Sequence, residues 1–153
     1  MSARDRSAKA VFSVHLIKPS HYDDDGYVIQ WVRCSIPSNT LAALYGLALD
    51  AASRQVLGPE VEIRLDAHDE TNTRINVKRL SRLIRSSSAG GLVALVGVQS
   101  NQYPRAMDLA RRFRAEGIQV CIGGFHVSGC LAMLPAMPQD LQEAVDLGVT
   151  LFA

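Results

Sequence analysis

The segment from Gly123 to Gly129 combines residue types that suit contact with a bound ligand. It reads Gly-Gly-Phe-His-Val-Ser-Gly and directly follows an apolar stretch. Two adjacent glycines let a ligand approach the backbone closely, because no side chain obstructs it, although a tight turn is the other use of such a pair. His126 can contact the ligand or orient the segment through a hydrogen bond. The predicted cofactor-binding residues of this segment are Gly123, Gly124, Phe125, His126, Val127 and Ser128.

Three further segments are rich in hydrogen-bonding side chains. The longest, 18–37, has 20 residues, whereas connections in α/β proteins usually have about 2–6. The second, 66–73, reads Asp-Ala-His-Asp-Glu-Thr-Asn-Thr, and the third, 99–103, reads Gln-Ser-Asn-Gln-Tyr. Connections of this kind commonly carry functional residues. The predicted cofactor-binding residues in these segments are Ser20, Asp69, Glu70, Thr71, Ser100 and Asn101.

Several catalytic and metal-binding patterns are missing. Cys34, Cys121 and Cys130 have wide, irregular spacing that fits neither a disulfide framework nor a zinc or iron–sulfur site, so free thiols are expected. The run Asp23–Asp25 is expected to be a solvated turn, because consecutive carboxylates rarely converge on one cation. No Gly-x-Ser-x-Gly motif and no convincing Ser/His/Asp set supports a hydrolase. We therefore assign no catalytic residue and no metal ligand.

The elements that must position these segments follow from hydrophobic periodicity. Apolar residues recur with helical spacing at Leu41, Leu44, Tyr45 and Ala48, and they alternate with polar residues from Val61 to Leu65. Strands are expected at Val11–Ile17, Val61–Leu65, Leu92–Val98, Ile118–Ile122 and Val149–Phe152. Helices are expected from Ser38 or Asn39 to Gly58, from Asn72 or Thr73 through Ile84, around Pro104 up to Gly117, and near Gln139–Leu147. The segment Gly123–Gly129 is expected to be a loop.

Alternating strands and helices predict an α/β fold with a doubly wound, five-stranded parallel sheet of flavodoxin-like order 2-1-3-4-5. A length of 153 residues suits a single domain, 1–153. In such sheets ligands bind beyond the carboxyl ends of the strands, at the point where the strand order reverses. The four polar segments are expected to meet at that edge.

Composition and charge limit the partners. The chain is 48% hydrophobic and 20% charged, with a net charge of +1, which fits a globular domain without general affinity for nucleic acid or membranes. The longest apolar run, Leu92–Val98, is far shorter than a membrane-spanning helix, and Met1–Asp5 does not begin a secretory signal. A cytoplasmic location is therefore expected.

The segment Gly123–Gly129, placed after a strand, resembles the cobalamin-binding N-terminal domain of cobalamin-dependent radical S-adenosylmethionine enzymes. The resemblance covers nearly the whole chain, including 69–71, the polar segment 99–103 and 148–150. Members of that family continue after the last strand into a radical domain, with S-adenosylmethionine and a three-cysteine iron–sulfur motif. This chain reaches Ala153 without that motif. The resemblance implies a non-catalytic cobalamin-binding module detached from its catalytic domain.

One departure concerns cobalt. Cobalamin domains of the mutase and methionine synthase type carry Asp-x-His-x-x-Gly after the first strand, and the histidine ligates cobalt. Here Asp66-Ala67-His68 follows the second strand, and Thr71 stands where glycine belongs. Cobalt is therefore not expected to be held by His68.

The resemblance implies that the domain positions the corrin, often for methyl transfer, with the nucleotide tail between a strand and a helix. The alternative is a flavodoxin-like domain that binds a flavin or another nucleotide. Flavodoxin-type sites usually have a Ser/Thr/Gly-rich phosphate loop after the first strand. Here that position has Lys18-Pro19-Ser20-His21, which offers little of this kind. If the radical domain is missing, apolar surface left uncovered should favour self-association of the chain.

Overall fold

The computed structural model describes residues 8–32 and 38–153. Its strands are β1 (Ala10–Lys18), β2 (Val61–Asp69), β3 (Gly91–Leu95), β4 (Gln119–Gly123) and β5 (Thr150–Phe152). Its helices are α1 (Asn39–Ser53), α2 (Val77–Arg85), α3 (Tyr103–Ala115), α4 (Phe125–Met133) and α5 (Gln139–Asp146). All five expected strands are present, and the expected α/β class is confirmed.

The strands form one sheet in the order β2-β1-β3-β4-β5, and every neighbouring pair is parallel. This is the predicted doubly wound order. The chain runs from β1 outward to β2, then returns across β1 to β3 and continues to β5. Crossovers between parallel strands are right-handed. Because the direction of travel reverses after β2, α1 lies on one face of the sheet, and α2 and α3 lie on the other.

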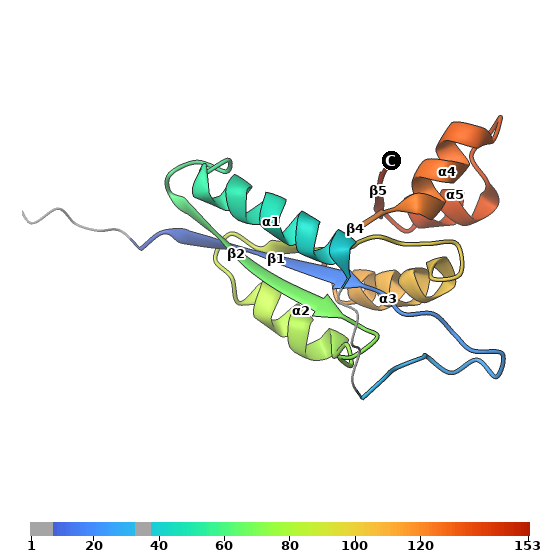
Figure 1. Ribbon diagram of the computed structural model, residues 1–153. Helices are drawn as coiled ribbons and strands as arrows, with labels where there is room; N and C mark the ends of the chain where they lie inside the picture. The colour runs from blue at the N-terminus through green and yellow to red at the C-terminus, as the bar shows by residue number, and fades with distance from the viewer. Residues whose placement is uncertain (1–7, 33–37) are drawn as a thin grey trace, which may run out of the picture.

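The two faces of the sheet are covered unequally. On one face, α1 packs its apolar residues against Val14, Leu16, Ala94 and Val96. On the other face, α2, α3 and α5 cover the larger core, in which Phe113 and Leu109 are fully buried. Figure 1 shows α1 on one side of β1 and β2, with α2 and α3 on the other. Much of β3, β4 and β5 therefore has no helix on the α1 side.

Several boundaries differ from the sequence expectation. Strand β2 continues beyond the expected end at Leu65 to Asp69, because its residues pair with β1 as far as Asp69. Asp66, Ala67 and His68 therefore lie in the strand and not in a loop after it. At other boundaries, local hydrogen bonds or glycine conformation override periodicity. Helix α2 begins at Val77, after a side-chain cap from Asn76, and not at Asn72 or Thr73, whose backbone N–H groups donate to Asp69 in a turn. Strand β3 ends at Leu95, shortly before Gly97, whose φ is +62°. Helix α1 ends at Ser53, before the expected stop at Gly58.

The expected loop at 123–129 was wrong in part, because α4 begins at Phe125. This helix was difficult to find from periodicity, since small and apolar residues lie all round it and do not form one stripe. Val127 is fully buried in the main core, so the first turn of α4 is held by packing. Of the residues predicted for ligand contact, Phe125 to Ser128 are thus on a helix.

No helix within residues 8–32 and 38–153 has the length and apolar character needed to cross a membrane. Cys121 and Cys130 are free thiols, as expected. Cys34 lies outside the described residues.

Candidate functional site

The predicted site residues lie after the carboxyl ends of adjacent parallel strands. Asp69 is the last residue of β2, and Ser100 follows β3. Gly123 ends β4 and leads into α4. The polar segments therefore meet at one edge of the sheet, but their residues play different parts there.

Glu70 and Ser20 anchor the long segment after β1. The Glu70 side chain is fully buried, and its Oε1 accepts a 2.6 Å hydrogen bond from Arg105 Nη2 of α3. Its Oε2 accepts from the backbone N–H of Ser20 at 3.1 Å. Burial opposes the charge of Arg105, but hydrogen bonds to Glu70 and Tyr22 outweigh it and raise the pKa of the guanidinium. Glu70 is thus a buried counter-ion, and Ser20 is held beside it.

Asp69 and Thr71 form the turn that follows β2. Asp69 Oδ1 accepts from the backbone N–H of Thr71 at 3.0 Å and from its hydroxyl at 2.6 Å. Lys18 Nζ lies 3.7 Å from the other carboxylate oxygen. The polar groups of Asp69 and Thr71 are therefore engaged with the chain itself.

Gly124 is required by a close approach between two backbone segments. Its φ is +143°, and a Cβ added there would lie 2.2 Å from the backbone nitrogen of Val98. The N–H of His126 donates to the carbonyl oxygen of Val98 at 3.0 Å. A Cβ on Gly123 would be 3.2 Å from that of Phe152. The glycine pair therefore lets the connection between β4 and α4 pack closely against neighbouring segments, and its backbone also lines a groove described below.

His126 is fixed by side chains from two other segments. Its Nδ1 lies 3.2 Å from Ser100 Oγ, and its Nε2 lies 2.9 Å from Asp140 Oδ2 of α5. Tyr103 packs on the imidazole with ring centroids 4.3 Å apart. Sequence inspection found no such Ser/His/Asp set. The nitrogens are used in the reverse of the serine-hydrolase order, in which the carboxylate binds Nδ1, so the set serves here to position His126.

Ser100, Asn101 and Phe125 lie together on the surface. With Gln99 they line an open depression of about 560 Å³. Phe125 is 72% exposed there. An exposed aromatic ring beside amide and hydroxyl groups suits a large, partly apolar ligand.

An apolar groove of about 420 Å³ lies on the α1 side of the sheet, at the ends of β1, β3 and β4. The sheet contributes Leu16, Ala94 and Cys121, and burial raises the pKa of the Cys121 thiol to about 11, so this group is neutral. One wall comes from α1 and the other from the turn after β4 and from β5. The residues of these walls include Thr40, Leu44, Ala48, Gly123, Gly124, Ser128 and Phe152. The volume lies in the range of small-molecule sites, about 300–1,000 Å³.

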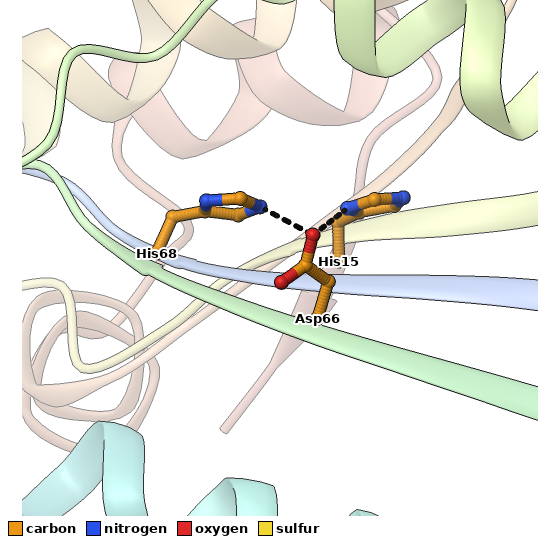
Figure 2. Close-up of side chains that lie close together, drawn as sticks. All are labelled: His15, Asp66 and His68. Carbon is orange, nitrogen blue, oxygen red and sulfur yellow. Dashed lines mark ion pairs between the residues drawn. The ribbon is translucent and has the colours of Figure 1, made fainter.

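A second cluster lies on the opposite face of the sheet. Asp66 Oδ2 is 3.6 Å from His15 Nδ1 and 3.2 Å from His68 Nε2. Figure 2 shows the three side chains projecting from β1 and β2 on the side away from α1. From the sequence, His68 was considered only for cobalt ligation, a role that was not expected of it, and this cluster was not predicted. The available signal was Asp66-x-His68, whose side chains share one face of a strand because residues alternate between faces.

Comparisons with models of protein families, with curated proteins and with solved structures found no match to this chain.

Proposed function

We propose that this chain is a cobalamin-binding module that positions the corrin for a radical S-adenosylmethionine domain, often for methyl transfer. The observation that carries the proposal is the apolar groove on the α1 side of the sheet. It lies over the ends of β1, β3 and β4 and so includes the point between β1 and β3 where the strand order reverses. Doubly wound sheets bind their ligands at that point. The resemblance of Gly123–Gly129 to cobalamin domains names the ligand.

The groove fits the nucleotide tail of cobalamin, which carries a planar, largely apolar base. Ala94 and Cys121 provide an apolar floor. Gly123 and Gly124 form part of one wall, where no side chain keeps a ligand away from the backbone. Thr40 and Ser128 add hydroxyl groups to the lining that can donate to tail oxygens. The tail would therefore lie between the sheet and α1.

The corrin ring fits the depression formed by Gln99, Ser100, Asn101 and Phe125. Amide and hydroxyl groups there can bond the amide substituents of the ring, and Phe125 can cover part of its face. The bound cofactor would supply the cobalt chemistry, while this chain holds and orients it. An iron–sulfur cluster and S-adenosylmethionine would belong to the radical domain.

We propose no histidine ligand to cobalt from this chain. His68 projects on the face of the sheet opposite to the groove. Both ring nitrogens of His126 are occupied by Ser100 and Asp140.

A flavin or another nucleotide is the alternative ligand. Flavodoxin-type sites hold phosphate in a loop after the first strand, but Ser20 in that segment is fully buried. Its hydroxyl donates to the carbonyl oxygen of Ile29. The Ser20 hydroxyl is therefore not free to bind a phosphate group, whereas the apolar groove can accept the base of cobalamin.

The test is a calorimetric and spectroscopic titration of the chain with cyanocobalamin and with cobinamide, which has the corrin but no nucleotide tail. We expect cobalamin to bind more tightly, by at least about tenfold. The variant Ala94→Phe places a ring in the groove and should remove this difference. The control Val56→Phe changes an exposed residue outside the groove and should bind as the wild type does.

Equal affinities for cobalamin and cobinamide would contradict the placement of the tail. Absence of binding to either compound would contradict the proposal. A parallel titration with flavin mononucleotide addresses the alternative, and tight binding of this compound alone would favour it.

A further inference from the structure

We propose that His15, Asp66 and His68 form a binding site for a divalent first-row transition-metal ion. Among the residues that the structure describes, this is the one group of three or more histidine, cysteine or carboxylate side chains with ligand atoms close enough to share an ion. The three ligand atoms lie within 4.8 Å of one another. The site is separate from the groove proposed for cobalamin, because it lies on the other face of the sheet.

Two imidazole nitrogens in the cluster have no hydrogen-bond partner. His15 Nδ1 and His68 Nε2 are both buried and unpaired, although a carboxylate oxygen lies near each. The His15 side chain is only 6% exposed, so water does not compensate it. A buried polar atom without a partner destabilises the folded chain. A shared metal ion would satisfy both nitrogens.

The spacing of the ligand atoms also suits a metal ion. Two ligands bound to zinc at about 2.0–2.2 Å with tetrahedral angles are about 3.3–3.6 Å apart. Asp66 Oδ2 is 3.2 Å from His68 Nε2 and 3.6 Å from His15 Nδ1. Small rotations of the side chains would therefore complete a site around one ion.

Two paired strands hold the three residues in place. Asp66 stands directly beside His15 in the register of β1 and β2, and His68 follows two residues later on the same face. The two imidazole rings are nearly parallel, with centroids 5.8 Å apart and an interplanar angle of 13°. Asp66 Oδ1 accepts from the backbone N–H of Ala67 at 3.0 Å, which leaves Oδ2 for the ion.

The ligand set selects the class of metal. Two imidazoles and one carboxylate suit zinc, iron, cobalt or nickel, whereas magnesium and calcium prefer oxygen ligands. Three protein ligands leave at least one coordination position open, as in catalytic zinc sites. Asp66 is 54% exposed at its side chain and lines an adjacent cavity of about 390 Å³ with Ser86, Ser87 and Ser88. Water or a small anion could therefore reach the ion.

The test uses the full chain without an affinity tag and titrates it with Co²⁺ and Zn²⁺. We expect one Co²⁺ per chain, with visible d–d absorption typical of nitrogen and oxygen ligands, and displacement of Co²⁺ by Zn²⁺. Zn²⁺ should also raise the melting temperature, because it binds only the folded chain.

The variants Asp66→Asn and His68→Gln should each weaken metal binding by at least about tenfold. Loss of a residue that only supports a metal ligand already weakens binding by about 10–100-fold. Asp66 is exposed enough that its variant should fold without metal, as circular dichroism would verify. The control His21→Gln changes a histidine outside the cluster and should leave binding unchanged.

Three results would overturn the proposal. The first is absence of Co²⁺ and Zn²⁺ binding to the wild-type chain. The second is equal binding by wild type, Asp66→Asn and His68→Gln. The third is a thiolate-to-cobalt charge-transfer band, which would place the ion on cysteine.

Discussion

Glu70 shows how one residue can satisfy a sequence pattern for ligand binding and serve another purpose. It lies in a polar segment after a strand, but in the folded chain its carboxylate is enclosed by the Arg105 guanidinium and the backbone of Ser20. Arg105 in turn donates to Tyr22 Oη. This network connects α3, the end of β2 and the long segment after β1.

We expect Glu70→Ala to lower the free energy of unfolding by about 3–5 kcal/mol, because it leaves the Arg105 charge buried without its partner. Urea denaturation followed by circular dichroism measures the change. The control Glu62→Ala breaks an exposed pair with Arg64 and should have little effect, because such pairs contribute little. A stable Glu70→Ala protein that had lost cobalamin binding would instead support the ligand contact predicted from the sequence.

At the scale of elements, the connection between β4 and α4 joins three parts of the candidate site. It forms a wall of the groove, it presents Phe125, and it places His126 beside Ser100 and Asp140. All three depend on the backbone contact between Gly124 and the segment after β3. A side chain at Gly124 would therefore disturb the fold before it could obstruct a ligand.

We expect Gly124→Ala to lower the free energy of unfolding by at least about 1–3 kcal/mol, since its Cβ meets the Val98 backbone at an unfavourable φ. The matched control is Gly129→Ala in α4, where a Cβ meets no atom within 4 Å. That change should stabilise the chain by about 0.5–1 kcal/mol, because alanine favours a helix more than glycine does. Equal stability of the two variants in urea would contradict the role given to Gly124.

At the scale of the molecule, the unequal covering of the sheet is the main feature. Helix α1 packs on β1 and β2 and reaches Ala94 of β3, whereas β4 and β5 are open on the same side along the groove. Phe152 of β5 is 60% exposed at its margin, and β5 is an edge strand. Exposed apolar surface next to a sheet edge favours contact between molecules.

We therefore expect the sedimentation coefficient of the chain to rise with protein concentration. Phe152→Glu should reduce this association, because it introduces charge at the margin of the groove. Val56→Glu alters an exposed apolar residue elsewhere and serves as the control. Sedimentation as a monomer at every concentration would show that the groove is not an association surface.

The sequence by itself predicted the five strands, most of the helices and the order of the sheet. Periodicity is a local property. One apolar face could therefore be assigned to Leu41, Leu44, Tyr45 and Ala48 before their contacts with the sheet were known. The right-handed crossover rule then converts the order of elements into topology. The observed ends of some helices and strands differ from those expected from periodicity, because of local turns and glycine conformations. Helix α4 was not predicted, because its apolar residues form no stripe.

Only the tertiary structure decided which side chains meet. Glu70 and Arg105 are 35 residues apart in the chain, and His15 reaches Asp66 only because β1 and β2 pair in one register. No local pattern encodes such a register or the depth of a side chain, which depend on how whole elements pack. For that reason the sequence indicated the edge of the sheet where the predicted ligand residues meet, while the roles of Glu70, Gly124 and His68 followed from the fold.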